Sequence, residues 1–216
     1  MNQAIPVIIF LGAPGAGKGT QALRLSQTKR IPRISTGDML RQAVQDDSEL
    51  GRKVKGIMQE GRLVADETML NLVESRISKP DCQTGFVLDG YPRNLHQAQQ
   101  LETVLTPNMQ PCVFRIDVSE DEIVRRVAGR RTCPRCERIY NIYFHRPKDD
   151  EKCDQDGAAL FRRDDDDEDV VRRRIDTYQE EIFPLIDYYR KKGVLHVVDG
   201  VQSEEKVSKE IHELLG

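Results

Sequence analysis

The chain has 216 residues, of which 38% are hydrophobic and 32% charged, and its formal net charge is −3. This length fits one domain, or one domain with insertions, that can bury a substantial core. The acidic balance argues against general nucleic-acid binding, and no apolar run approaches the roughly 18 residues that span a bilayer. No export signal precedes the first motif, so we expect a cytoplasmic protein whose five cysteines form no disulfide framework.

The first motif is a glycine-rich loop at residues 12–20, between an apolar, β-branched run at residues 7–11 and a helical pattern at residues 21–26. Glycines let the backbone approach an anion closely, and the N-terminus of the helix directs N–H groups toward phosphate. Lys18 adds a positive charge. Strict Walker A sequences carry Ser or Thr directly after this lysine, whereas here Gly19 precedes Thr20. The order of strand, loop and helix predicts a phosphate site; the alternative is a glycine-rich turn without a ligand.

Strand and helix patterns alternate along the rest of the chain. Strands are predicted at residues 31–34, 85–90, 111–118 and 194–198. Helices are predicted at residues 39–44, 48–59, 67–77, 95–105, 119–128, 169–192 and 203–214, and Pro184 predicts a kink in the sixth. The alternation indicates an α/β fold with helices on both faces of a parallel sheet. Ligands bind at the carboxyl ends of such strands, where the loop, Asp38, Asp89 and Gly200 should converge.

Polar residues mark the expected helix starts. The predicted N-caps are Ser35 or Asp38, Asp66 and Asn94, and Ser119 and Glu122 predict a capping box. Residues 35–64 and 131–162 interrupt the alternation and are expected to form insertions on the ligand side of the sheet. The aspartate run at residues 164–167 is expected to be solvated at a helix start, where anions are favoured.

Arginines are concentrated in one part of the chain: 12 of the 22 lie between Arg125 and Arg174. In an acidic chain this favours a small polyanionic ligand, because guanidinium groups bind phosphate bidentately. The alternative is a solvated helix face with salt bridges.

Two knuckles with the same spacing predict a metal site. Cys133 and Cys136 form the first, and Cys153 and Asp156 form the second. Three thiolates and one carboxylate would close a tetrahedral site without a position for water, so a structural metal, zinc, is expected. His145 is a rival for the fourth position. A redox-active cysteine pair and a set of unconnected free cysteines are competing interpretations of the same residues.

Five ordered motifs, at residues 12–20, 35–41, 86–93, 129–136 and 163–166, resemble those of long-form bacterial adenylate kinases with a metal-binding lid. The resemblance covers essentially the whole chain. It implies a P-loop NTPase-type core at residues 1–34, 65–126 and 164–216. It also implies a helical insertion for the nucleoside monophosphate at residues 35–64 and a small β-rich metal-binding lid at residues 127–163.

The resemblance also implies a reaction, reversible transfer of phosphate from ATP-Mg²⁺ to AMP giving two ADP, by a monomer. ATP would be bound by Gly15, Ala16, Gly17, Lys18, Gly19, Thr20, Arg126, Arg130 and Gln202. AMP would be bound by Thr36, Arg41, Gly61, Leu63, Val64, Gly90, Arg93, Gln97, Arg163 and Arg174. Catalysis would rest on Lys18, Asp89, Arg93, Arg126, Arg163 and Arg174, with Asp89 positioning hydrated Mg²⁺.

Two points stay open in the sequence. Arg162 and Arg173 stand beside Arg163 and Arg174. We select Arg163 because it fits the Arg-x-Asp-Asp spacing, and Arg174 because it directly precedes the apolar Ile175. A kinase for another monophosphate, such as UMP or CMP, and a non-catalytic nucleotide switch are the competing functions.

Overall fold

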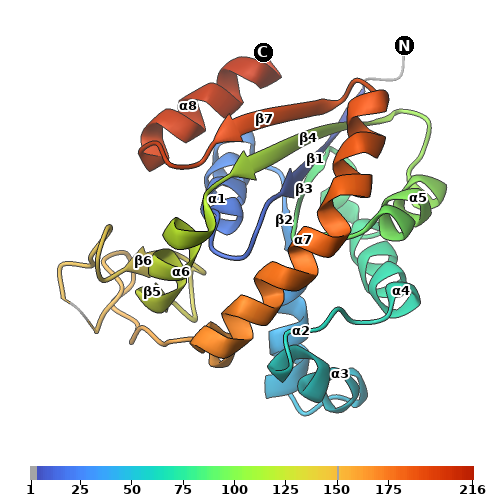
Figure 1. Ribbon diagram of the computed structural model, residues 1–216. Coiled ribbons are helices and arrows are strands. Elements are labelled where there is room, and N and C mark those ends of the chain that lie inside the picture. The colour runs from blue at the N-terminus through green and yellow to red at the C-terminus, as the bar shows by residue number, and fades with distance from the viewer. Residues whose placement is uncertain (1–3, 150) are drawn as a thin grey trace.

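The computed structural model describes residues 4–149 and 151–216. Its centre is a parallel sheet of five strands in the order β2-β3-β1-β4-β7 (Figure 1). The strands are β1 (Ile5–Leu11), β2 (Arg33–Ser35), β3 (Phe86–Asp89), β4 (Met109–Asp117) and β7 (Leu195–Asp199). All neighbouring pairs are parallel. Each predicted strand is present, and the α/β fold class is confirmed.

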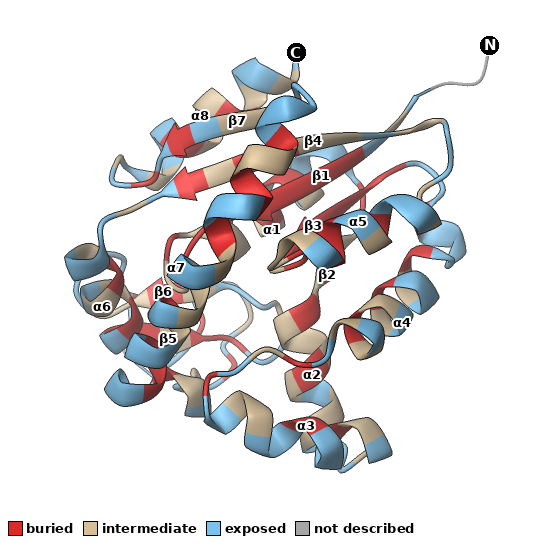
Figure 2. Cartoon of the chain, turned by 45° about the vertical axis from the view of Figure 1, so that its right-hand side comes forward, coloured by how far each residue is buried: buried red, intermediate tan, exposed pale blue. Residues whose placement is uncertain are grey.

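Helices cover both faces of this sheet, because alternate residues of β1 are apolar on both sides. Ile8 and Phe10 pack with α1 (Lys18–Lys29) and α8 (Glu204–Leu215). Val7, Ile9 and Leu11 belong to a second core cluster, which also contains residues of α4 (Asp66–Ile77), α5 (Leu95–Val104) and α7 (Glu168–Lys191). Figure 2 shows the buried residues concentrated on the strands and on the inner sides of the helices.

Two segments lie beyond the carboxyl ends of the strands (Figure 1). One contains α2 (Thr36–Gln45) and α3 (Glu49–Gln59). Leu40 and Val54 of these helices belong to the same core cluster as Val7, Ile9 and Leu11. The other follows α6 (Glu120–Ala128) and contains the antiparallel pair of β5 (Arg130–Thr132) and β6 (Ile139–Asn141). Its own core consists of Cys133, Tyr140, Cys153 and Ala158. This second segment therefore has little apolar material to stabilise it.

Some of the predicted helix N-caps are correct and others are wrong. Ser35 and Asn94 cap α2 and α5 through their side chains. Asp66 is the first residue of α4 and not its cap; Ala65 is, and the Asp66 carboxylate turns toward α5. The predicted capping box is wrong, because Ser119 makes no side-chain cap hydrogen bond and Glu122 instead accepts a hydrogen bond from Arg126.

The last long helix, α7, continues without interruption past Pro184. Short 3-10 turns, η1 (Pro80–Cys82) and η2 (Asp164–Asp166), complete the elements. Within the described ranges, none of the helices combines the length and the apolar composition that crossing a membrane requires.

Candidate active site

A cavity of about 570 Å³ lies at the carboxyl ends of the strands, where the sequence predicts the ligand. The residues assigned to ATP from the sequence all line it: Gly15, Ala16, Gly17, Lys18, Gly19, Thr20, Arg126, Arg130 and Gln202. Five of those assigned to AMP line it too: Arg41, Gly90, Arg93, Arg163 and Arg174. Asp89 also lines this cavity.

The glycine loop owes its path to two close approaches. Gly15 has a φ of 81°, and a Cβ there would lie 2.6 Å from Cγ2 of Val127, so only glycine fits without a shift. A Cβ on Gly19 would lie 3.2 Å from Oδ2 of Asp89 and 3.3 Å from Cδ1 of Ile139. Ser or Thr at this position would require Asp89 or Ile139 to shift by a few tenths of an ångström, so glycine suits this packing better.

Lys18 is the first residue of α1, and its side chain folds back onto the loop. Its Nζ donates hydrogen bonds to the carbonyl oxygens of Gly12 and Ala13, both at 2.8 Å. The pKa of Lys18 is lowered to about 7, chiefly by burial and also by neighbouring arginines such as Arg93 and Arg174, while Asp89 opposes this shift. An anion in the cavity would stabilise the charged form of Lys18 and raise its pKa again.

Several arginines surround the cavity, each beside a carboxylate. Arg130 donates to Asp166, with Nε at 2.9 Å from Oδ2. Nη1 of Arg174 lies 2.7 Å from Oδ2 of Asp165. Burial lowers the pKa of both Arg163 and Arg174, and nearby arginines lower it further. The cluster therefore carries buried positive charge that the neighbouring carboxylates only partly balance.

The aspartate run is predicted from the sequence to be solvated, and for two of its members this is wrong. Asp166 is buried against Arg130, and Asp165 is half-buried. Burial would raise the pKa of Asp165, but Arg174 and other arginines outweigh it and lower that pKa to about 2. Only Asp164 and Asp167 are exposed.

Lys18 and Arg93 differ from the paired arginines. Within residues 4–149 and 151–216, no carboxylate oxygen lies within 4.0 Å of either side-chain cation. Nε of Arg93 donates only to the carbonyl oxygen of Gly90, at 2.8 Å. Burial and the neighbouring Arg41 lower the pKa of Arg93. These two cations are therefore the ones that lack counter-charge at the cavity.

Arg33 is a site residue that the sequence analysis missed. Its Nη2 lies 2.8 Å from Oδ2 of both Asp89 and Asp38, and its Nη1 lies 2.6 Å from Oε2 of Glu137. It therefore links the end of β3, the start of α2 and the β5–β6 segment. The one signal in the sequence is an arginine in a short strand that ends at the same sheet edge as Asp89.

The remaining residues assigned to AMP are placed beside this cluster. Gly61, Leu63, Val64 and Gln97 line an adjoining cavity together with Arg41, Arg93 and Arg174. Thr36 is fully buried, and its hydroxyl donates to the carbonyl oxygen of Gly90 at 3.0 Å. Gln97 is also buried.

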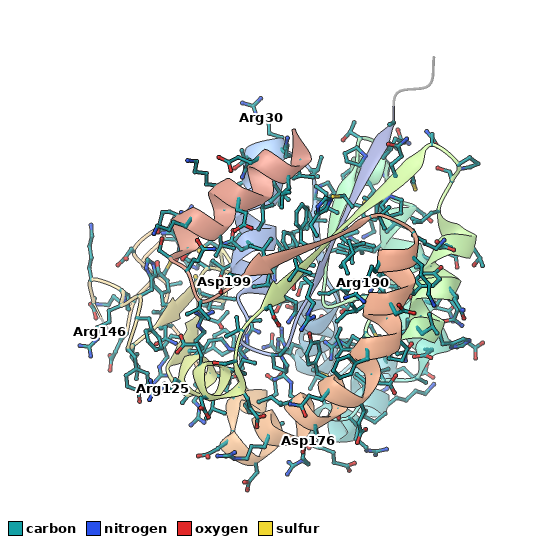
Figure 3. The ribbon with its side chains drawn as sticks, turned by 45° about the horizontal axis from the view of Figure 1, so that its top comes forward. Arg30, Arg125, Arg146, Asp176, Arg190 and Asp199 are labelled. Carbon is teal, nitrogen blue, oxygen red and sulfur yellow. The ribbon has the colours of Figure 1, made fainter. Side chains whose placement is uncertain are left out.

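The arginines between Arg125 and Arg174 lie in two different environments, one exposed and one at the cavity. Arg125 and Arg146 are exposed and point away from the molecule (Figure 3). Arg162 and Arg173 are exposed too, and they donate to the carbonyl oxygens of Asp166 and Glu60. Their neighbours Arg163 and Arg174 line the cavity instead, so the geometry favours the residues selected from the sequence spacing.

The four predicted metal ligands come together in the β5–β6 segment. Ligand atoms of Cys133, Cys136, Cys153 and Asp156 all lie within 4.8 Å of one another. The sulfurs of Cys136 and Cys153 are 3.5 Å apart, and that of Cys133 lies 3.4 Å from both Asp156 oxygens. These separations suit a tetrahedral centre with bonds of about 2.3 Å to sulfur.

His145 does not belong to this group. Its ring stacks on that of Tyr140, with the centroids 5.8 Å apart. Backbone N–H groups of Arg135 and Gln155 point at the sulfurs of Cys133 and Cys153, at 3.4 Å each, as expected around thiolates. The donor set of three sulfurs and one carboxylate therefore fits a structural metal ion.

Comparison with known proteins agrees with this geometry. A family model described as adenylate kinase matches residues 10–194. The adenylate kinase of Archaeoglobus fulgidus is 50% identical over 210 residues, which cover 96% of this chain and 97% of the relative. Those of Thermodesulfovibrio yellowstonii and Thermosipho melanesiensis are 46% and 47% identical, over 96% and 94% of this chain and 98% and 96% of the relatives. The chain belongs to the adenylate kinase family.

Proposed function

We propose that the protein transfers the terminal phosphoryl group of ATP-Mg²⁺ reversibly to AMP, giving two ADP. The observation that carries this proposal is the convergence of Lys18, Arg93, Arg126, Arg130, Arg163 and Arg174 on one cavity at the carboxyl ends of the strands. Phosphoryl transfer needs little covalent help from a protein, because positioning and charge stabilisation supply most of the catalysis. A site built from cations around a phosphate loop is suited to that task.

Each residue has a role in this proposal. Lys18 and the backbone N–H groups of the loop hold the outer phosphates of ATP, and Arg41 and Arg93 hold the phosphate of AMP in line with them. Arg126, Arg130, Arg163 and Arg174 neutralise charge on the transferring group. Mg²⁺ brought with ATP would supply further positive charge to the phosphate oxygens, and Asp89 would help to hold it.

We also propose that residues 35–64 and 127–163 act as a monophosphate-binding insertion and a lid on the core formed by residues 1–34, 65–126 and 164–216. Ion pairs that span these segments support the assignment. Arg33 pairs with Glu137 at 2.6 Å, Arg163 with Asp38 at 3.5 Å, and Arg41 with Asp165 at 3.6 Å. Closure excludes water from the transferring phosphoryl group. Without closure, water would hydrolyse ATP. We expect the monomer to be active, as the resemblance to long-form adenylate kinases implies.

A coupled assay of ADP formation with AMP, UMP, CMP and GMP as acceptors tests this function. Efficient turnover with AMP alone is the expected result. A preference for UMP or CMP would assign the protein to another acceptor, and nucleotide binding without turnover would make it a switch. The presence of Thr36 and Gln97 favours AMP by the resemblance to adenylate kinases, and Gln97 lines the adjoining cavity.

Binding of ATP is expected to take up protons above pH 7. The pKa of Lys18 is about 7 in the free protein, and phosphate beside it would raise that pKa. At pH 8 the lysine is therefore mostly neutral before ATP binds and charged afterwards. The contribution of Lys18 to affinity should therefore be greatest below pH 7 and fall as the pH rises above that value. Calorimetry at pH 8 in buffers of different ionisation enthalpy measures the uptake, and a heat independent of the buffer would contradict it.

Arg93→Ala is expected to lower kcat/KM for AMP on the order of 100-fold, because the acceptor phosphate would lose its unpaired cation and its alignment. The KM for ATP should change much less. Steady-state kinetics with each substrate varied in turn measure both effects. Arg52→Ala, at an exposed position on α3, is the matched control. Unchanged dependence on AMP would show that Arg93 does not bind the acceptor.

A further inference from the structure

Gln97 lies in the first turn of α5, only 1% exposed, and lines the cavity beside Arg41 and Arg93. Both ends of its side-chain amide already have protein partners. Oε1 accepts a hydrogen bond from the backbone N–H of Arg93 at 2.8 Å. Nε2 donates to Oδ1 of Asp66, also at 2.8 Å. The amide is therefore held from two directions.

Asp66 is in turn held by three side chains. Its Oδ1 also accepts a hydrogen bond from Nδ2 of Asn94 at 3.1 Å, and its Oδ2 lies 2.7 Å from Nδ1 of His96. Burial would raise the pKa of Asp66, but hydrogen bonds with His96, Gln97 and Asn94 outweigh it and hold that pKa below its usual value. The carboxylate is thus ionised at neutral pH and can only accept hydrogen bonds.

These contacts permit one orientation of the Gln97 amide. If the amide were flipped, its oxygen would face the Asp66 carboxylate and its NH₂ group would face the N–H of Arg93. One contact would then place two acceptors against each other, and the other would place two donors against each other. Leaving buried polar groups unpaired in this way is costly.

We infer that Asp66 is a positioning residue which, through Gln97, makes the monophosphate site prefer a 6-amino purine over a 6-oxo purine. This inference rests on the proposed function. After its two protein contacts, Gln97 has one lone pair on Oε1 and one N–H on Nε2 left for a base. Adenine offers an amino donor beside a ring nitrogen acceptor, which matches this pair. Hypoxanthine offers a carbonyl acceptor beside an N–H donor, which requires the flipped amide.

The same residues could also serve only the helix start. The backbone N–H of Gln97 donates to Oδ1 of Asn94 at 2.8 Å, so Gln97 belongs to the cap of α5. A purely structural role for Asp66 would change stability without changing the choice of base. The ratio of kcat/KM for AMP to that for inosine monophosphate, which differs from AMP at the 6-position, therefore separates the two roles.

Asp66→Ala is expected to reduce this ratio about tenfold, because only the backbone N–H of Arg93 would still oppose the flipped amide. The change should come from a higher KM for AMP and a lower KM for inosine monophosphate. The KM for ATP and kcat at saturating AMP should stay close to the wild-type values. Asp66 is the partly exposed first residue of α4, where Ala is tolerated. Asp66→Ser provides a second variant if Asp66→Ala melts below the assay temperature.

Asp66→Asn is the conservative variant, and it should restore the preference for AMP. Its side-chain oxygen can face Gln97 and Asn94 while its NH₂ group faces His96. Glu67→Ala, which removes an exposed carboxylate from the same turn, is the matched control and should leave the ratio unchanged.

The outcomes are distinguishable. Wild-type protein that phosphorylates neither nucleotide would overturn the proposed function itself. Wild-type protein that prefers AMP, together with an unchanged ratio in folded Asp66→Ala, would overturn only the inference about Asp66. A lower melting temperature with an unchanged ratio would likewise assign Asp66 to the helix start alone.

Discussion

Lys18→Met is expected to remove most phosphoryl transfer while leaving the fold intact. Lys18 is one of the two cavity cations without a carboxylate partner in the described structure, so its charge is available to the phosphates of ATP. Loss of one such preorganised donor typically costs about 10²–10³-fold in kcat. Met keeps the length and the apolar stem of the side chain, and it removes a buried amine whose pKa is already lowered to about 7. Stability should therefore not fall.

The measurement is kcat in the coupled assay together with a thermal melting curve. Lys29→Met provides the control, because Lys29 is exposed in the last turn of the same helix. It should behave like the wild type in both measurements. Turnover within a few-fold of the wild type in folded Lys18→Met would mean that this lysine does not stabilise the transferring phosphoryl group.

The sheet and the phosphate loop could be predicted because their signals are local. A run such as Val7 to Leu11 is apolar on both faces, which only a central parallel strand buries, and the observed β1 (Ile5–Leu11) extends it by two residues. The glycines of the loop report backbone conformation directly. Asn94 likewise lies next to the N–H groups it caps.

The charged contacts could not be predicted, because their partners are distant in the sequence. Asp166 is buried only because Arg130, 36 residues earlier, lies against it. Asp66 turns away from its own helix toward Gln97, 31 residues later. Glu122 could have accepted a hydrogen bond from the backbone at the helix start, but it instead pairs with the charged side chain of Arg126. A sequence pattern gives the residue types but not which tertiary partner wins.

Arg33 illustrates the same limit at the site. Its position in a short strand gives no periodic signal, yet its side chain is only 5% exposed and contacts three carboxylates. The contact depends on the parallel register that places Ser35 beside Asp89. The contact also requires β2 and β3 to be neighbours in the sheet, and no local sequence pattern encodes this strand order.

Removal of the lid metal is expected to lower stability more than it lowers activity. We propose that Cys133, Cys136, Cys153 and Asp156 bind one structural zinc ion, because four ligands close a tetrahedral site without a position for water. The β5–β6 segment buries little else: two of the four residues in its core are ligands themselves. Binding free energy therefore becomes folding free energy here.

Cys153→Ala or a strong chelator should lower the melting temperature by several degrees or more, since each kcal/mol lost shifts it by about 2–4 °C in a chain of this length. Asp156→Ala should have a smaller effect, because a carboxylate is a harder ligand than thiolate and binds zinc less strongly. Cys112→Ala, outside the knuckles, controls for loss of a thiol. His145→Ala should retain the metal, because its ring lies on Tyr140 and not among the ligands.

Elemental analysis should find about one zinc per chain in the wild type and less in Cys153→Ala. At low temperature, turnover should fall less than the melting curve suggests, provided that Arg126, Arg130 and Arg163 still reach the phosphates. The proposal is wrong if metal-free protein melts at the same temperature as the loaded protein. Loss of turnover at unchanged stability would instead mean that the metal takes part in the chemistry, which a closed site of four protein ligands does not allow.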